Sequence, residues 1–210
     1  ARWTLPLSVT QELHVGAEWT VGSADYDYTS VVTYTEEVAD LFGKPVGSVA
    51  RFAENPTIRG LHLYVSHRWD LTPTLLAETG VRFERDSGFG LEGASVVDPR
   101  FALRWVVRPN THLRLQWGRF HQSDEVNELR VQDGMTQFDR PQRSDHLILG
   151  FDHLTPAGVM LRAEAFSKRQ LDPRERFENL FDRLAILPEL EPDRVRIAPD
   201  SSQLRGVELS

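Results

Sequence analysis

Cysteine is absent from the 210-residue sequence, which excludes a disulfide framework and any cysteine-ligated metal site. No apolar run reaches the about 18 residues that a membrane-spanning helix needs. Basic residues do not predominate, because 24 Lys and Arg stand against 31 Asp and Glu, a net charge of −7. That balance argues against nucleic-acid binding. Residues 1–7 lack the pattern of a secretory signal, so we expect that such a signal was removed or that the chain continues upstream.

The pattern that is present is strict alternation of apolar and polar residues, the period of a β-strand with two unlike faces. In the clearest example, Leu13, Val15, Ala17, Trp19 and Val21 alternate with polar or small residues. The length favours one domain. Seven segments follow the same rule: 13–21, 61–69, 75–84, 101–108, 113–118, 146–152 and 159–165.

Short and long connections alternate between these segments. The short ones contain turn formers such as Pro73, Pro109 and Pro156. Outer-membrane barrels have short turns at one end and long loops at the other, and their strands need about 9–11 residues against about 5–6 in soluble proteins. We therefore predict an all-β fold, an antiparallel up-and-down transmembrane β-barrel, with a soluble β-sandwich as the alternative. The long connections are 30–56, 87–97, 122–143 and 171–203.

Two further segments lie near the ends of the chain, at 2–7 and 204–210. Together with the seven above they make about nine strands, and the first and last run in the same direction. An antiparallel barrel cannot close by joining two such strands, and lipid does not tolerate open edges. We therefore expect residues 1–210 to be part of a single, larger barrel domain. Pro6 makes the first segment the least regular, because proline removes a hydrogen bond from the sheet.

The alternation assigns side chains to two sides of the predicted barrel. A charge that faces lipid costs about 2–4 kcal/mol at mid-membrane, so charged residues are expected to face the lumen. There, interstrand ion pairing and contact with a plug are favoured over direct ligand contact. The candidate lumen-facing residues are Glu18, Arg68, Glu78, Arg82, Glu84, Arg104, Arg114, Arg162 and Glu164. The candidate lipid-facing residues are Leu63, Val81, Leu103, Trp105, Leu115, Trp117, Leu149 and Leu161.

Four motifs in the second half of the chain occur in series. They are HLRLQWGRF at 112–120 before the pair Glu128–Leu129, FDRPQRSDH at 138–146, RAEAFSK at 162–168, and RGVEL at 205–209. In this order they resemble the C-terminal part of the β-barrel of a TonB-dependent outer-membrane receptor. Gln142 departs from the Glu that is usual in the second motif. The first hundred residues fit the family by strand pattern alone, and no plug domain, energy-coupling box or terminal strand of the barrel is present.

The resemblance implies a receptor and transporter in the outer membrane of a Gram-negative bacterium. Such a protein takes up a scarce, large nutrient of the siderophore, cobalamin or glycan class and is driven through TonB. The implied partners are outer-membrane lipid, the protein's own plug domain, the TonB complex and the nutrient ligand. The alternative is a passive porin-like channel, which would lack a plug.

No catalytic, cofactor or metal site is predicted. His14, His62, His112 and His146 alternate onto the lumen side, but they occupy different strands and are interpreted as polar lining. Ser144 and His146 share a face without a third catalytic group, which argues against an enzyme. Two acidic stretches, 25–28 and 193–200, lack calcium-loop spacing and are interpreted as solvated extensions of strand or loop.

The long loops 30–56, 122–143 and 171–203 are the candidate ligand-capture surfaces, because binding sites concentrate on loops carried by rigid scaffolds. Within the last loop, residues 176–187 have helical spacing of their apolar residues. We therefore predict a loop helix that folds over the mouth of the barrel, with its apolar side packed within the loop. Its apolar residues are Phe177, Leu180, Phe181, Leu184 and Leu187.

Overall fold

The computed structural model describes residues 1–210 except 92–93, 182–183, 185 and 189–190. Within the described part, no helix has the length and apolar character needed to cross a membrane. The elements are β1 (Arg2–Ser8), β2 (Gln11–Ser23), β3 (Tyr26–Thr33), α1 (Glu36–Phe42), β4 (Gly47–Glu54), β5 (Thr57–Thr72), β6 (Leu75–Ser87), β7 (Ala94–Arg108), β8 (Thr111–Gln122), the 3₁₀ turn η1 (Val131–Asp133), β9 (Gln142–Leu154), β10 (Met160–Leu171), β11 (Arg176–Asn179), β12 (Arg194–Ile197) and β13 (Ser201–Leu209).

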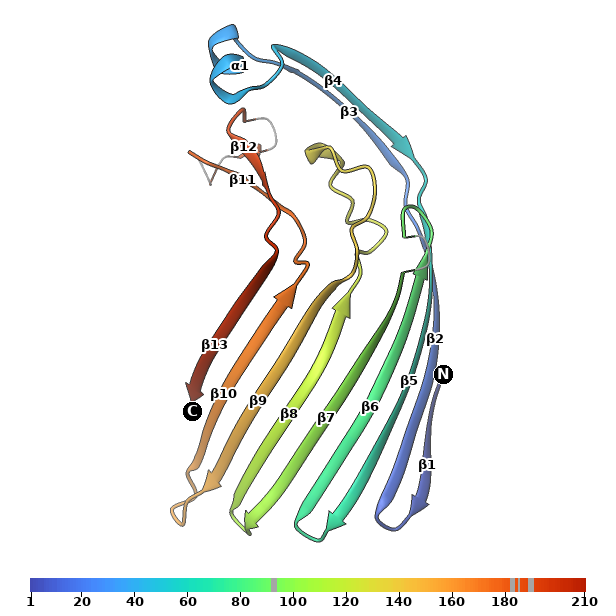
Figure 1. Ribbon diagram of the computed structural model, residues 1–210, viewed down its shortest axis with the longest axis vertical. Coiled ribbons are helices and arrows are strands. Elements are labelled where there is room, and N and C mark those ends of the chain that lie inside the picture. Colours follow the sequence, from blue (N-terminus) through green and yellow to red (C-terminus); the bar gives the residue numbers. More distant parts are fainter. Residues whose placement is uncertain (92–93, 182–183, 185, 189–190) are drawn as a thin grey trace.

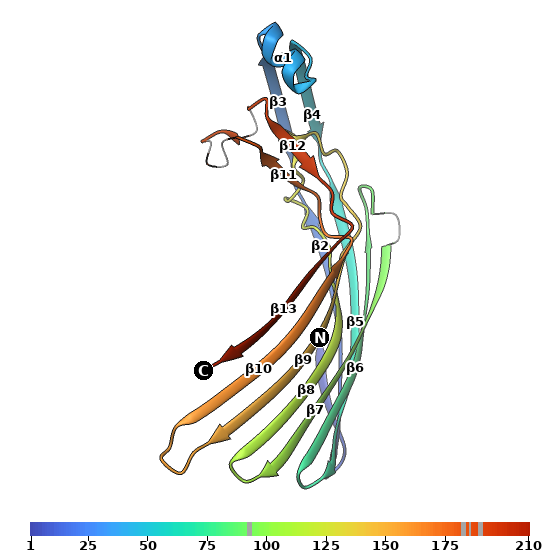
Figure 2. The ribbon, with the colours of Figure 1, turned by 60° about the vertical axis from the view of Figure 1, so that its left-hand side comes forward.

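Nine strands form one curved antiparallel sheet in the order β1-β2-β5-β6-β7-β8-β9-β10-β13 (Figures 1 and 2). The predicted all-β, up-and-down arrangement and the count of nine strands are confirmed. Every neighbouring pair is antiparallel, so β1 and β13 run in the same direction, and they lie at opposite edges of the sheet. Pro6 lies in β1, an edge strand, next to a shift in register between Pro6 and Ser8. An edge position tolerates proline because one side of the strand has no partner.

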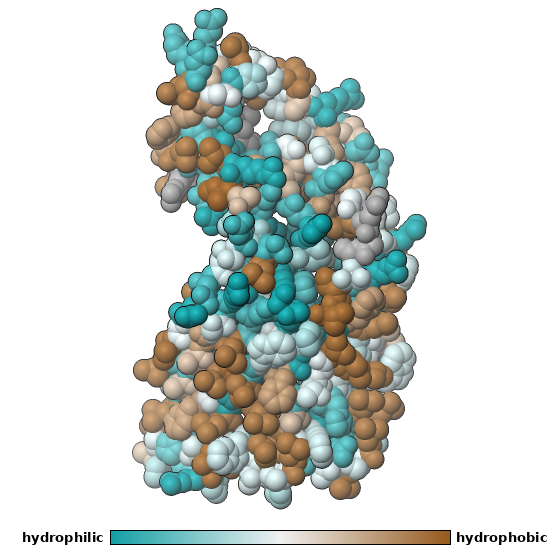
Figure 3. Space-filling view, in the orientation of Figure 1, coloured by the Kyte–Doolittle hydropathy of each residue, from teal (hydrophilic) through white to brown (hydrophobic). Residues whose placement is uncertain are grey.

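The period-two pattern of the sequence becomes two faces of this sheet. Cross-strand partners in this sheet share parity except beside three of the short turns, as in Leu103 opposite Leu115 and Leu115 opposite Leu149. We call the side that carries these residues the odd face and the other side the even face. Trp105 and Leu149 on the odd face are 48% and 54% exposed. Figure 3 shows apolar side chains over the lower part of the sheet and hydrophilic ones toward the loops.

The exposure of the odd face excludes the β-sandwich alternative. A sandwich buries one face of each sheet against the other. In the part of the chain that the structure describes, the two remaining sheets have two strands each, β3-β4 and β11-β12. Both lie beyond the loop end of the large sheet rather than across it (Figures 1 and 2).

Short turns gather at one end of the sheet and long connections at the other (Figure 1). The connection between β2 and β5 is an ordered hairpin, β3-β4, with α1 at its tip. Thr35 caps α1, since its side chain accepts a hydrogen bond from the Val38 N–H at 3.4 Å. Gly43 ends the helix with a left-handed φ of 61°, which glycine adopts without steric cost.

The buried apolar core lies among the loops. Leu91, Leu129 and Phe138 are each no more than 6% exposed and pack together. Loop segments distant in sequence are therefore held together by apolar contact, and they cover the upper end of the sheet as one body. The partly buried side chains around them are Tyr26, Phe52, Ile58, Phe89, Val131 and Met135.

The helix predicted for 176–187 is wrong in the described part of that range. Residues 176–179 form strand β11, which pairs with β12 through Phe177 opposite Arg196 and Glu178 opposite Val195. A surface helix is stabilised by burying its apolar stripe, but Phe181 and Leu184 are 78% and 91% exposed. Residues 182–183 and 185 of the predicted helix lie outside the described residues.

Candidate functional site

The even face carries every charged residue that the sequence assigns to the predicted lumen. The cross-strand register shows this, because Glu18 stands opposite His62 and His62 opposite Glu84. The lipid-facing candidates share the odd face in the same way. The even-face set is Glu18, Arg68, Glu78, Arg82, Glu84, Arg104, Arg114, Arg162 and Glu164. The odd-face set is Leu63, Val81, Leu103, Trp105, Leu115, Trp117, Leu149 and Leu161.

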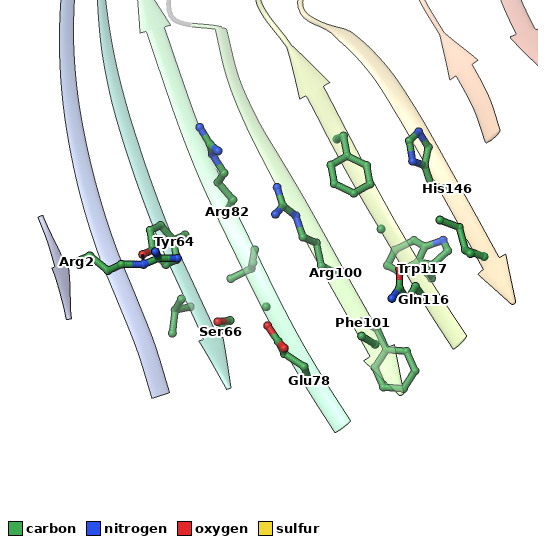
Figure 4. Close-up of a pocket in the computed structure, with 17 residues that line it drawn as sticks. Arg2, Tyr64, Ser66, Glu78, Arg82, Arg100, Phe101, Gln116, Trp117 and His146 are labelled. Atoms are coloured by element: carbon green, nitrogen blue, oxygen red, sulfur yellow. Dashed lines mark hydrogen bonds between the residues drawn. The ribbon is translucent and has the colours of Figure 1, made fainter. Parts of the chain in front are cut away.

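A cavity of about 460 Å³ opens along the even face between β1 and β9 (Figure 4). Glycines make room for it, since Gly80 and Gly118 present no side chain to the space. Arg2 donates a hydrogen bond from Nε to the Tyr64 hydroxyl at 2.8 Å, and the Arg100 guanidinium lies 4.8 Å from the Phe120 ring centre. The cavity therefore combines cationic groups with aromatic surface. This combination suits an anionic ligand, or an anionic protein segment, that carries planar or aromatic groups.

Interstrand ion pairs join some of the predicted charges lower on the same face. Asp152 on β9 accepts Nε of Arg114 from β8 and Nε of Arg162 from β10, each at 2.9 Å. Arg114 also lies 3.7 Å from Glu164. The predicted ion pairing is thus confirmed here, with Asp152 as the shared acceptor that the candidate set lacked. These pairs bind three neighbouring strands on the polar side of the sheet.

A second group lies at the upper end of the even face, close to the loops. Asp98 is 1% exposed and accepts hydrogen bonds from the His121 ring at 2.6 Å and from the His121 backbone N–H at 3.0 Å. On β5 and β6, His62 lies 3.2 Å from Asp86. Ligand atoms of His62, Glu84 and Asp86 all fall within 4.8 Å of one another. Sequence reasoning missed this group because it treated each histidine alone, whereas cross-strand register unites it with two acids.

Ser144 and His146 do form a hydrogen bond, at 2.7 Å between Oγ and Nε2. The His146 ring also lies 4.8 Å from the ring of Phe120. The pair lines the wall of the even face beside the cavity, as Figure 4 shows for His146. This geometry fits the predicted polar lining.

Partly buried arginines tie the β8–β9 connection to the connection between β10 and β13. Arg174, which follows β10, contacts Asp124 at 2.7 Å and Glu128 at 3.2 Å in the β8–β9 connection. Arg194 on β12 pairs with Asp133, and both Arg130 and Arg194 lie over the Phe177 ring. A cavity of about 610 Å³ lies between these loops, lined by groups of both signs. The loops therefore form one charged surface above the sheet.

Burial raises the pKa of two carboxyls in this loop surface. Desolvation outweighs the Arg174 guanidinium and raises the pKa of Asp124 above 3.8. Desolvation and then the Glu175 carboxylate raise the pKa of Asp139. Both groups are therefore harder to ionise than ordinary aspartates.

Two residues in the acidic stretches, Asp193 and Tyr26, depart from the interpretation that these stretches are solvated. Asp193 is 5% exposed and accepts hydrogen bonds from the Asn179 side chain at 3.1 Å and the Phe181 N–H at 2.7 Å. Its role is to join β11 to the segment before β12. Tyr26 is partly buried, and its hydroxyl donates to the Val126 carbonyl at 2.9 Å. In both cases the side chain forms a hydrogen bond with a backbone group of the loops, because a buried N–H or C=O needs a partner.

A family model described as TonB dependent receptor-like, beta-barrel, matches residues 1–210. The chain belongs to the TonB-dependent receptor family. The resemblance drawn from the four motifs is thereby confirmed, and it extends to the first hundred residues, where no motif supported it. No curated protein sequence matches the chain.

Solved structures of other proteins share the fold of this chain. One is a mutant of the ferric enterobactin receptor PfeA from Pseudomonas aeruginosa, with a TM-score of 0.64 and 15% identity, covering 99% of this chain. Another is the FrpB iron transporter from Neisseria meningitidis, with a TM-score of 0.65 and 14% identity, again over 99% of this chain. The chain spans 31% of the length of each. The family is one of receptors, in agreement with the prediction that the chain is not an enzyme.

Proposed function

We propose that the chain is part of the barrel wall and loop surface of an outer-membrane receptor that takes up a scarce nutrient. Membership of the TonB-dependent receptor family over residues 1–210 carries the proposal. TonB-dependent receptors are proteins of the Gram-negative outer membrane. In this role the odd face meets lipid and the even face lines the lumen, where it contacts a plug domain outside this chain. The TonB complex drives uptake through that plug.

The favoured ligand class is a ferric chelate. The solved neighbours include a ferric enterobactin receptor and an iron transporter. The wall cavity adds support, because Arg2, Arg82 and Arg100 line it beside the Tyr64 and Phe120 rings. Ferric siderophores that carry negative charge and aromatic chelating groups match both features. Cobalamin and glycans are the other ligand classes, and neither would require this density of arginine.

The test is uptake by cells that make the full-length receptor and lack other receptors for the same nutrient. Radio-iron-labelled siderophores, labelled cobalamin and labelled oligosaccharides are supplied separately, with and without an intact tonB system. We expect saturable iron uptake that stops when TonB is lost. Uptake of iron that continues without TonB would identify a passive porin-like channel, and uptake of cobalamin or glycan alone would contradict the ligand class.

The loop surface is proposed to capture the ligand. Removal of residues 173–199 from the full-length receptor takes away β11 and β12 and leaves the paired part of β13 in place. We expect ligand affinity to fall while the barrel still inserts, which surface labelling and binding measurements on whole cells can follow. Unchanged affinity would refute the role of this loop.

A further inference from the structure

Three side chains of metal-binding type converge at the upper end of the even face. His62 on β5 stands directly opposite Glu84 on β6, and Asp86 lies two residues further along β6. Their ligand atoms all lie within 4.8 Å of one another. Among the residues that the structure describes, no other three His, Asp or Glu side chains bring their ligand atoms this close together.

The space between these groups exists because residue 60 is glycine. A Cβ placed on Gly60 would lie 2.5 Å from Thr20 Oγ1, 2.7 Å from Asp86 Oδ1 and 2.9 Å from His62 Nε2. Polar atoms from three strands therefore surround one point in front of the Gly60 backbone. An ion would lie further from the backbone than that Cβ, among the same side-chain atoms, and small side-chain movements would bring them to zinc–nitrogen and zinc–oxygen bond lengths of about 2.0–2.2 Å.

The charges around this point favour a cation. Glu84 and Asp86 are 8% and 7% exposed, and burying two neighbouring carboxylates is costly unless positive charge compensates them. Arg82 supplies one positive charge through its contact with Glu84. Two carboxylates against one guanidinium leave one negative charge uncompensated when the His62 ring is neutral.

The surrounding contacts orient the ligand atoms. Ser123 Oγ donates to Asp86 Oδ2 at 2.7 Å, which leaves Asp86 Oδ1 directed at the point beside Gly60. Arg82 Nη2 lies 3.4 Å from His62 Nδ1 on the other side of the ring. A metal on Nε2 requires a proton on Nδ1 in the neutral ring, so Arg82 must turn away from His62 while it keeps Glu84.

We propose that His62, Glu84, Asp86 and Thr20 bind one divalent transition-metal ion of the zinc class in the wall beneath the loops. One imidazole nitrogen with carboxylate and hydroxyl oxygens suits such an ion better than calcium, which takes oxygen ligands alone. The ion joins β2, β5 and β6 and, through Ser123, anchors the β8–β9 loop. The site is independent of the ligand class proposed above.

The test is calorimetric titration of Zn²⁺ into the purified full-length receptor in detergent after chelator treatment. We expect the wild type to bind one more equivalent than His62→Gln and Asp86→Asn. Gly60→Ala keeps every ligand but fills the space between them, and it is also expected to lose that equivalent. Gly22→Ala is the matched control, since a Cβ there meets only the Val126 side chain, at 3.2 Å.

Circular dichroism and melting curves establish that each variant is folded. Should Gly60→Ala fail to fold, Ser123→Ala takes its place, because loss of a hydrogen-bond partner behind a metal ligand weakens binding by about tenfold or more. Equal zinc uptake by the wild type, His62→Gln and Gly60→Ala would overturn the proposal. So would a wild type that binds no zinc.

Discussion

Individual arginines decide how the loops are held above the sheet. Arg174 reaches two acids and also donates to the Ser123 carbonyl at 2.7 Å, so one side chain bridges the connection after β8 and the connection after β10. Its side chain is 22% exposed, whereas that of Arg176 is 62% exposed in its pair with Glu178. Such exposed pairs contribute about 0–1 kcal/mol. Because Arg174 is the more buried of the two, we expect its substitution to destabilise the loops more than substitution of Arg176.

Arg174→Gln is expected to loosen residues 123–141. Loss of hydrogen bonds to charged groups costs about 1.5–3 kcal/mol each, reduced here by partial exposure, and Asp124 is left without its nearest cation. Hydrogen exchange of the full-length receptor should show faster exchange across the loop. Arg176→Gln is the control and should change little. Equal exchange in both variants would show that Arg174 has no special role.

Asp139 gives the loop surface a pH dependence. Its pKa is raised in the folded protein, so the folded state binds more protons than the unfolded state as pH rises above 3.8. Loop stability therefore falls with rising pH through this window, and the loss remains at neutral pH. Asp139→Asn should stabilise the loop at neutral pH and flatten this dependence.

Proteolysis of the 123–141 loop in the full-length receptor, followed at neutral pH and in mild acid, measures this effect. The backbone N–H of residue 139, which donates to Asp124 at 3.3 Å, is kept in the variant. Asp200→Asn, at an exposed position of the neighbouring loop, serves as the control. A variant that is cleaved faster than the wild type at neutral pH would show that the ionised Asp139 stabilises the loop.

At the scale of elements, neighbouring residues of one strand face opposite sides of the sheet, one apolar and one polar. Leu115 on β8 lies between Leu103 and Leu149 on the odd face, and the next residue, Gln116, lines the cavity of the even face. A strand reverses the direction of its side chains at every residue, so neighbouring positions test opposite faces. The strand length of 12 residues is sufficient for a tilted membrane crossing.

Leu115→Arg is expected to cost about 2–4 kcal/mol of stability if the odd face meets hydrocarbon, whereas Gln116→Arg should change stability little. Urea unfolding of the full-length receptor in lipid vesicles measures both. The two variants add the same side chain to the same strand, so overall charge and folding effects are matched. Equal losses in the two variants would contradict the assignment of lipid to the odd face.

The whole sheet has two open edges, and this limits what the chain can do alone. β1 and β13 each have one partner and run in the same direction, so they cannot complete a closed antiparallel barrel with each other. Open edges present unpaired N–H and C=O groups that attract further strands. We propose that further strands supply their partners in a complete receptor.

Residues 1–210 expressed alone and refolded in detergent are therefore expected to associate through these edges. Size-exclusion chromatography with light scattering should show oligomers or aggregates, while the full-length receptor in the same detergent should be uniform. A stable, uniform monomer of residues 1–210 would mean that the sheet closes or covers its edges without further strands.

Alternation in the sequence by itself determined the nine strands of the large sheet and, away from the turns, the face of each side chain, because a strand's period of two is a local property. It also indicated that the first and last strands run in the same direction, as β1 and β13 do. Residues 176–187 show the limit of local pattern. Their apolar spacing is helical, yet Arg176–Asn179 form a strand because Arg194–Ile197, distant in sequence, satisfy their backbone groups.

Only the tertiary structure decided which residues meet across strands and loops. Asp152 joins Arg114 and Arg162, and His62 joins Glu84 and Asp86, through lateral register. The loop core of Leu91, Leu129 and Phe138 forms from two separate connections. Register and loop packing depend on contacts between segments far apart in the chain. Periodicity within one segment carries no information about such contacts.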